Sequence, residues 1–517
     1  MATTAFESVH EESIVGKLTT VDRMIFNGYL TGILPPGYFG LFLWRQGVRL
    51  KEYKSYVGKA TARVKERARQ IADEAGRPFI YLNRTTDKDG LAKSIAARDG
   101  IESGLICVLS ELELRGSFDV RYNPASGHLE VVRRPRKCLH YYFYLIDDEF
   151  GFMHVRIQSW FPFDMQIYIN GREWLARQLD RRGIGYQRYE NTFLAIDDMK
   201  VAEALCRRFA HRKWPRALDA FARRVNPWLA TVRRFAGRGY YWVVDQCEIA
   251  TDVMFQSRPR LSTLVPELYG HAVQAFSAEE VMRFLGRKLT GNFKGEIVTD
   301  QKRRPEGCRV RHRVKANWIK MYDKWSVLRI ETTINKPRDF RVLRVVKDKR
   351  GRKKRRWMAM GKGVANLWRY IQIGTQANAR YLDALGSVHF KGEAIAELDR
   401  LCRSRTKRGK RFARFNPVTE RDSALFRAVL DGQHVVNGFR NKDLRARLHS
   451  KAMHSPDQTR RECARISRLI AKLRGHGLVA KVHKSRLYRV TPRGYRLMAA
   501  ALHYRNASFP EGLATAA

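Results

Sequence analysis

Acidic, basic and phenolic side chains gather in the middle of the chain in an order that suits phosphodiester chemistry. Glu248 and Asp252 belong to one predicted strand, and the period-two alternation of a strand puts both on the same side. Glu331 lies in a later predicted strand, and the hard oxygens of three carboxylates are suitable ligands for Mg²⁺ or Mn²⁺. Tyr322 offers an aryl oxygen that can carry a phosphodiester through a covalent intermediate. Three nearby cations would neutralise the scissile phosphate: Lys320, Lys324 and Arg329.

A structural interpretation of the same residues stays open. Acidic side chains on a strand beside Lys and Arg commonly form ion pairs that let a basic sheet edge fold.

A single imidazole, that of His312, lies near these acids in the sequence. A metal site would therefore use oxygen ligands from Glu248, Asp252 and Glu331 plus the imidazole of His312.

The acid-bearing strand, the run Ile-Lys-Met-Tyr-Asp-Lys at 319–324 and the run Leu-Arg-Ile-Glu at 328–331 resemble the replication initiators of filamentous phages and related rolling-circle plasmids. The resemblance covers residues 240–335. It implies a small antiparallel sheet that holds a divalent metal, and a tyrosine that attacks a phosphodiester. The chain departs from the broader class in one respect, because that class carries a strand with two histidines separated by a bulky apolar residue.

The C-terminal residues 419–505 predict a compact helical unit that ends in a hairpin. Helices are expected at 423–430, 441–448 and 460–474, and two strands at 478–482 and 486–490. This order, with the run 473–494, resembles the winged helix-turn-helix domains of MarR-type regulators. On the third helix and the wing, the cations predicted to contact nucleic acid are Arg461, Arg465, Arg468, Lys472, Lys481, Lys484 and Arg486. The alternative is a protein-docking module with a solvated basic face.

The chain carries 99 Lys and Arg against 51 Asp and Glu, a formal charge of +48. Such an excess must sit on the surface, where a polyanion would screen it, so we expect RNA or DNA as the partner. We expect a basic loop or hairpin tip at 347–356 and a basic linker at 403–418. Further candidate phosphate contacts are Lys349, Arg352, Lys353, Lys354, Arg355, Arg356, Arg403, Arg405, Lys407, Arg408, Lys410, Arg411, Arg133, Arg134, Arg136 and Lys137.

Aromatic side chains crowd two predicted neighbouring strands, at 140–144 and 160–163. Some of them must alternate away from the core, and Tyr142 and Tyr144 are the candidates to stack on unpaired bases. Ordinary core packing is the alternative.

The predicted fold class is α+β and multidomain: two domains with mixed or antiparallel sheets, followed by a C-terminal winged helix. The expected parts are an N-terminal domain at 1–198, a basic helical connector at 199–235, a central domain at 236–402, the linker, and the winged helix at 419–505. Seven scattered cysteines without a CxxC pair favour a reducing cytoplasm, as in a nucleoid-associated or ribonucleoprotein component. The only strongly apolar early stretch is too interrupted to span a bilayer, so no membrane partner is expected.

Three runs, at 104–108, 150–156 and 170–177, are similar to an uncharacterised bacterial protein family, which implies a bacterial source. Three functions fit the sequence. The first is a nucleic-acid-binding protein without chemistry, linked to mobile DNA or replication and needing no cofactor. The second is a nickase or strand-transfer enzyme that uses Mg²⁺ or Mn²⁺. The third is a transcription regulator, which would use the winged helix alone. DNA against RNA, and the oligomeric state, stay open at this point.

Overall fold

The computed structural model describes residues 4–83, 85–287, 297–304, 307–347, 351–386, 393–407, 409–449, 456–483 and 485–508. The chain divides into two compact units. The N-terminal unit comprises Thr19–Ile249 and Gly361–Ile371, and the C-terminal unit comprises Met1–Leu18, Ala250–Met360 and Gln372–Ala517. These units do not follow the boundaries expected from the sequence, because the predicted connector at 199–235 belongs to the N-terminal unit and the predicted linker belongs to the C-terminal unit.

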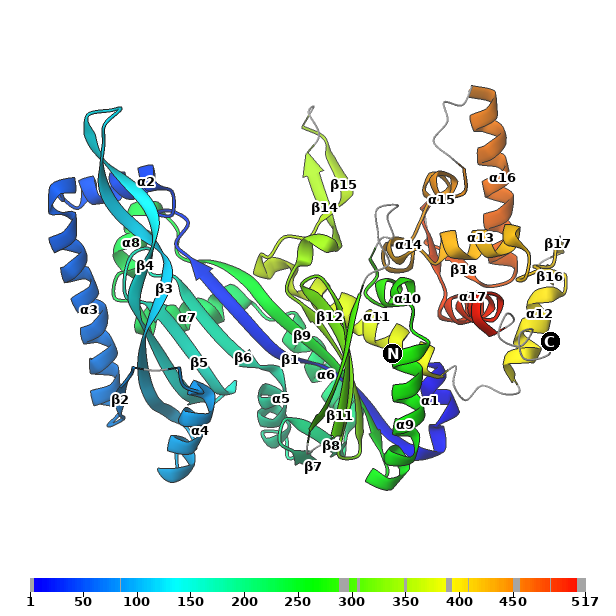
Figure 1. The fold of residues 1–517 in the computed structure, drawn as a ribbon, viewed down its shortest axis with the longest axis horizontal. Helices are drawn as coiled ribbons and strands as arrows, with labels where there is room; N and C mark the ends of the chain where they lie inside the picture. Colours follow the sequence, from blue (N-terminus) through cyan, green and yellow to red (C-terminus); the bar gives the residue numbers. More distant parts are fainter. Residues whose placement is uncertain are drawn as a thin grey trace. The chain divides into compact units, whose positions relative to one another are not determined.

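A mixed sheet forms the centre of the N-terminal unit, with strand order β1-β6-β5-β4-β3-β2. The strands are β1 (Ile14–Tyr29), β6 (Met165–Asn170), β5 (Gly151–Gln158), β4 (His128–Asp147), β3 (Gly104–Asn123) and β2 (Phe79–Leu82). Strand β2 runs parallel to β3, and the pairings β1·β6, β3·β4, β4·β5 and β5·β6 are antiparallel. The sequence predicts four short strands, at 105–109, 118–122, 129–132 and 139–146, whereas β3 and β4 are two long strands that form one hairpin (Figure 1).

Helices cover both faces of this sheet at strand β3. Helix α3 (Tyr53–Glu74) and helix α4 (Lys88–Arg98) both contact this strand. Val57, Ala60 and Val64 of α3 are buried at helical spacing, as an amphipathic helix requires. The remaining named elements of this unit are α2 (Pro36–Arg45), α5 (Gly171–Asp180), β7 (Tyr186–Tyr189), β8 (Thr192–Ile196), α6 (Met199–Ala210), α7 (Trp214–Val225) and α8 (Leu229–Ala236).

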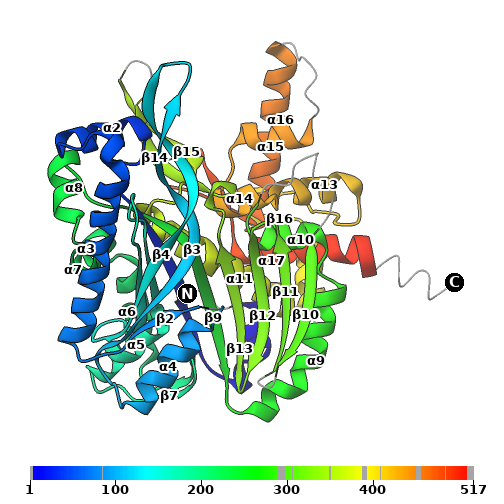
Figure 2. The ribbon, with the colours of Figure 1, turned by 60° about the vertical axis from the view of Figure 1, so that its left-hand side comes forward.

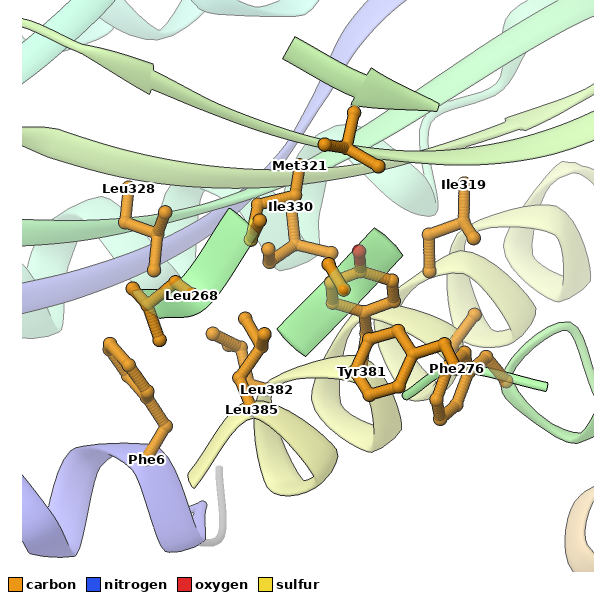
Figure 3. Close-up of a cluster of buried hydrophobic side chains, with 14 of the residues drawn as sticks. Phe6, Leu268, Phe276, Ile319, Met321, Leu328, Ile330, Tyr381, Leu382 and Leu385 are labelled. Carbon is orange, nitrogen blue, oxygen red and sulfur yellow. The ribbon is translucent and has the colours of Figure 1, made fainter. Parts of the chain in front are cut away.

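In the C-terminal unit the strands follow the order β10-β11-β12-β13-β9 (Figure 2). They are β10 (Val298–Arg304), β11 (Gly307–Val314), β12 (Asn317–Lys324), β13 (Val327–Ile334) and β9 (Tyr241–Phe255), whose residues from Ala250 onward belong to this unit. Ile319, Met321, Leu328 and Ile330 point to one face of the sheet, as alternation dictates. They share a core with side chains of α1 (Ala5–Val9), α9 (Arg258–Gln274), α10 (Ala278–Phe284) and α11 (Leu367–Leu385) (Figure 3).

The hairpin of β14 (Arg341–Lys347) and β15 (Lys353–Ala359) projects from the end of this sheet region (Figure 1). A second core gathers the C-terminal elements. They are α12 (Glu393–Cys402), β16 (Arg405–Lys407), β17 (Lys410–Phe412), α13 (Glu420–Val429), α14 (Gly432–Asn437), α15 (Asn441–Leu448), α16 (Pro456–Gly475), β18 (Val479–Lys481), β19 (Tyr488–Val490) and α17 (Pro492–His503). The predicted linker is instead a hairpin, β16–β17, which contacts α16, and Phe415 after it enters the core.

The mixture of sheets and many helices confirms the α+β class. Among the helices in the described part of the chain, none combines the length and the apolar character needed to cross a bilayer.

Candidate nucleic-acid interface

The β12–β13 hairpin brings together three of the predicted catalytic residues and one of the predicted metal ligands. Its register places Lys320 opposite Glu331 and Tyr322 opposite Arg329. Because the intervening residues of both strands point into the apolar core, these four side chains share the other face of the sheet. Lys324, two residues beyond Tyr322 on β12, lies on that face as well.

Glu331 is the central acceptor of this group. Its side chain is only 2% exposed and pairs with the ammonium of Lys320. Its second oxygen, Oε2, accepts a hydrogen bond of 2.5 Å from the hydroxyl of Tyr322. Burial alone would raise the pKa of the Glu331 carboxyl, but the charge of Lys320 and the two hydrogen bonds outweigh it, so the pKa is lowered. Glu331 is therefore a carboxylate in neutral solution, which accepts the hydrogen bond from Tyr322.

Asp252 and Arg329 form a buried, bidentate ion pair beside this group. Nε of Arg329 donates to Oδ1 of Asp252 at 2.6 Å, and a terminal guanidinium nitrogen donates to Oδ2 at 2.9 Å. The side chain of Arg329 is 2% exposed and that of Asp252 is 0% exposed. Two parallel charge-assisted hydrogen bonds are the strongest arrangement available to such a pair, so both residues are held in place.

The predicted acidic metal ligands have hydrogen-bonding partners within the protein. Lys320 pairs with Glu331, Arg329 pairs with Asp252, and Glu248 accepts a hydrogen bond of 2.8 Å from Gln246. His312 is opposite Ile319 in the register, so it points to the apolar face, away from Lys320 and Glu331. The expectation that His312 joins these acids is therefore wrong.

His312 has a structural place instead. Its Nε2 is 3.0 Å from the hydroxyl of Tyr381, and its Nδ1 is 3.0 Å from the hydroxyl of Thr299. Burial lowers the pKa of His312 to about 4, so the ring is neutral at ordinary pH.

The β14–β15 hairpin presents cations on both strands. Its register places Arg344 opposite Arg356 and Lys347 opposite Lys353. Side chains directly opposite in an antiparallel pair have Cβ atoms about 4.5–5.5 Å apart, and like charges there are destabilising. The exposed cations of the hairpin are Arg341, Arg344, Lys347, Arg352, Lys353, Lys354, Arg355 and Arg356. Of the cations predicted here, Lys349 lies outside the described residues.

The β16–β17 hairpin repeats this pattern on a smaller scale. Lys407 is opposite Lys410 in its register. The predicted contacts that are exposed here are Arg403, Arg405, Lys407, Lys410 and Arg411. Arg408 is outside the described residues.

Helix α16 exposes three of the four cations predicted on it: Arg461, Arg465 and Arg468. Lys472 is the exception, because it lies beside the buried stripe of the helix. Its Nζ is 3.5 Å from Asp422 and 3.8 Å from the ring centroid of Phe415. Burial lowers the pKa of its ammonium. Lys472 thus packs at the edge of the core of this unit, and its contact with nucleic acid stays a prediction.

The hairpin after α16 exposes Lys481 and Arg486, while Lys484 is outside the described residues. In the N-terminal unit, Arg133, Arg134 and Lys137 of β4 are exposed. Arg136 is half-buried, and it donates to Asp119 at 3.2 Å with its guanidinium 5.1 Å from the ring centroid of Trp160.

Tyr142 and Tyr144 do not form a base-stacking surface. They are 7% and 1% exposed, and they pack in a cluster with Ala92 and Ile95 of α4. Their hydroxyls donate to carboxylates, Tyr142 to Glu113 and Tyr144 to Asp89, the latter at 2.7 Å. The prediction failed because α4 covers the sheet face that the alternation leaves free.

Three cations on β11 were not expected as site residues from the sequence. Arg309 is opposite Tyr322 and Arg311 is opposite Lys320, so they share the polar face of β12, and Arg313 continues the row. Arg309 and Arg311 both pair with Asp300 of β10. The sequence pattern that could have revealed them is Arg at every second position of 309–313.

The chain matches no protein-family model, no curated protein and no solved structure.

Proposed function

We propose that this protein binds nucleic acid by contacting its phosphates with several exposed basic elements. The observation that supports this most directly is the β14–β15 hairpin, where like charges stand opposite each other on exposed strands. Such pairs cost stability in the free protein, and a bound polyanion would turn that repulsion into attraction. Release of the counterions condensed on a nucleic acid would add to the binding free energy.

We also propose that the C-terminal elements form a winged helix that orients the nucleic acid. Helices α13, α15 and α16 share a core with the short hairpin β18–β19, and Phe439 bridges to Tyr488 of that hairpin. In this arrangement α16 is the recognition helix, and β18–β19 is the wing that contacts the backbone. We propose a place in replication or in mobile DNA from the resemblance of residues 240–335 to rolling-circle initiators. The scattered cysteines and the three runs similar to a bacterial family support a bacterial cytoplasm.

Replacing Arg465 and Arg468 together by alanine should weaken nucleic-acid binding about tenfold or more, because each exposed cation on a recognition helix contacts a phosphate or base edge. Fluorescence anisotropy with labelled duplex, hairpin and single-stranded oligonucleotides at low ionic strength would measure this. The matched control removes two exposed cations of α3, Lys54→Ala with Lys65→Ala, and should change affinity less than about twofold. An α16 variant that stays within twofold of the native protein would favour protein docking. A native protein that binds none of these oligonucleotides, nor heparin, would overturn the proposed function.

A strand-cleaving activity is the second candidate, and the hydrogen bond from Tyr322 to Glu331 favours it. In the cleavage step the Tyr322 oxygen would attack the phosphorus while its proton passes to Glu331. The bond from phosphorus to the leaving nucleotide oxygen breaks, water supplies a proton to that oxygen, and the phosphate stays on the tyrosine. Lys320, with its ammonium beside Glu331, would offset the developing negative charge.

If the second candidate is right, the native protein should form a covalent adduct with labelled single-stranded or hairpin DNA, tested with and without Mn²⁺. Tyr322→Phe should abolish the adduct, because the nucleophilic oxygen is gone. Glu331→Gln should reduce it strongly while nucleic-acid affinity stays unchanged. Denaturing gel electrophoresis resolves the adduct, and the absence of both cleavage and adduct with the native protein would reject this activity.

A further inference from the structure

The β14–β15 hairpin is a narrow ribbon with cations on both faces. Alternation puts Leu343, Val345 and Lys347 on one face, across from Trp357, Arg355 and Lys353. The other face carries Arg344 and Val346, across from Arg356 and Lys354. No acidic residue stands in the described strands, 341–347 and 353–359. The ribbon is therefore positive all the way round, and each face also bears apolar side chains.

A ribbon that is cationic on both faces suits a ligand that surrounds it with phosphates. A flat anionic surface, such as a membrane or one strand of nucleic acid, would contact one face and leave the charges of the other unmatched. A groove of a double helix, by contrast, has a phosphate backbone along each wall. The ribbon is about 24 Å long, from seven residues per strand at about 3.4 Å each, so it can span several base pairs.

The grooves of double-stranded nucleic acids differ in whether they admit a ribbon. The major groove of B-form DNA is about 12 Å wide and accepts a two-stranded β-ribbon, whereas its minor groove is about 6 Å wide. The major groove of A-form RNA is deep and too narrow for side chains to read. Exposed Leu343, Val345 and Met358 would also find apolar partners in the B-form major groove, which displays the thymine methyl groups.

We propose that the β14–β15 ribbon enters the major groove of double-stranded, B-form DNA, which makes duplex DNA the preferred ligand of this protein. The inference rests on the proposed function and specifies its ligand. Arg344 and Arg356, on one face, and Arg355, on the other, then meet the phosphate walls or the acceptor edge of guanine.

The variant Arg344→Gln with Arg356→Gln separates binding from folding. Both side chains are exposed, so the variant should unfold at a temperature close to that of the native protein. Its affinity for duplex DNA should fall about tenfold, and the slope of log K against log salt should become shallower by about 1.8, from two lost phosphate contacts at about 0.9 each. The control Lys54→Gln with Lys65→Gln removes the same charge from α3 and should leave both quantities close to native.

Dimethyl sulfate footprinting tests the groove itself, because the reagent methylates guanine N7 at the major-groove edge. The native protein should protect guanines in duplex DNA, and the ribbon variant should lose part of that protection. Anisotropy should rank duplex DNA above RNA duplex and single strands of the same sequence. Equal or tighter binding of RNA, unchanged N7 reactivity, or a ribbon variant with native duplex affinity would each overturn the major-groove assignment. The proposed function would survive those results as long as the native protein binds some nucleic acid.

Discussion

Replacing Asp252 by asparagine should lower the free energy of unfolding of the C-terminal unit by about 3–5 kcal/mol. The reason is that Arg329, 2% exposed, would keep its charge without the carboxylate that holds it in two hydrogen bonds. Removing one partner of a buried pair leaves the other charge desolvated and uncompensated. Urea denaturation of the full chain, followed by circular dichroism, would give the shift in the midpoint of the transition.

Two further variants make this result specific. Asp252→Leu with Arg329→Met replaces the pair by apolar side chains and should recover most of the lost stability. Asp245→Asn breaks an ion pair with Lys362 whose side chains are about two-fifths exposed, and it should cost no more than about 1 kcal/mol. An Asp252→Asn protein as stable as the native one would show that the pair does not stabilise the sheet.

The affinity for nucleic acid should fall by about 10³–10⁵ when monovalent salt rises from 50 to 200 mM, the range expected for six to ten phosphate contacts. The exposed cations of β14–β15, β16–β17 and α16 are numerous enough to make that many contacts. Fluorescence anisotropy in a KCl series gives the slope directly, and glutamate in place of chloride controls for anion competition. A slope close to zero would mean that phosphates contribute little, and it would contradict the electrostatic basis of the proposed function.

Three strands of the C-terminal unit could be predicted closely from the sequence. Apolar residues alternate with polar ones at 309–314, 318–322 and 327–334, which predicts strands there, and β11, β12 and β13 have similar bounds. The β3–β4 hairpin was harder, because the middle of β3, from Leu112 to Gly116, is largely exposed between buried segments at 106–110 and 117–119. Without a buried face, the residues there need not alternate, and the run was divided into shorter strands.

The candidate site was only partly predictable, for a geometric reason. Alternation assigns side chains to faces within one strand, but the register between strands decides which residues of neighbouring strands meet. Lys320, Tyr322, Arg329 and Glu331 came together as expected, whereas the register placed His312 opposite Ile319. Tertiary packing decided the outcome for the two predicted stacking residues. Tyr142 and Tyr144 alternate as predicted, yet helix α4, from a distant part of the sequence, covers them.

The path of the chain through its two units has a consequence for synthesis on the ribosome. The amide of Ala5 donates to Asp383, 378 residues later, at 2.8 Å. Phe6 shares a core with Leu385, which is also translated much later. Neither contact can form until α11 has been translated, and contacts so distant in sequence form slowly. An expression fragment that begins after residue 18 would lack Phe6, which belongs to the core of the C-terminal unit. A fragment that stops before residue 361 would lack Gly361–Ile371, which belongs to the N-terminal unit.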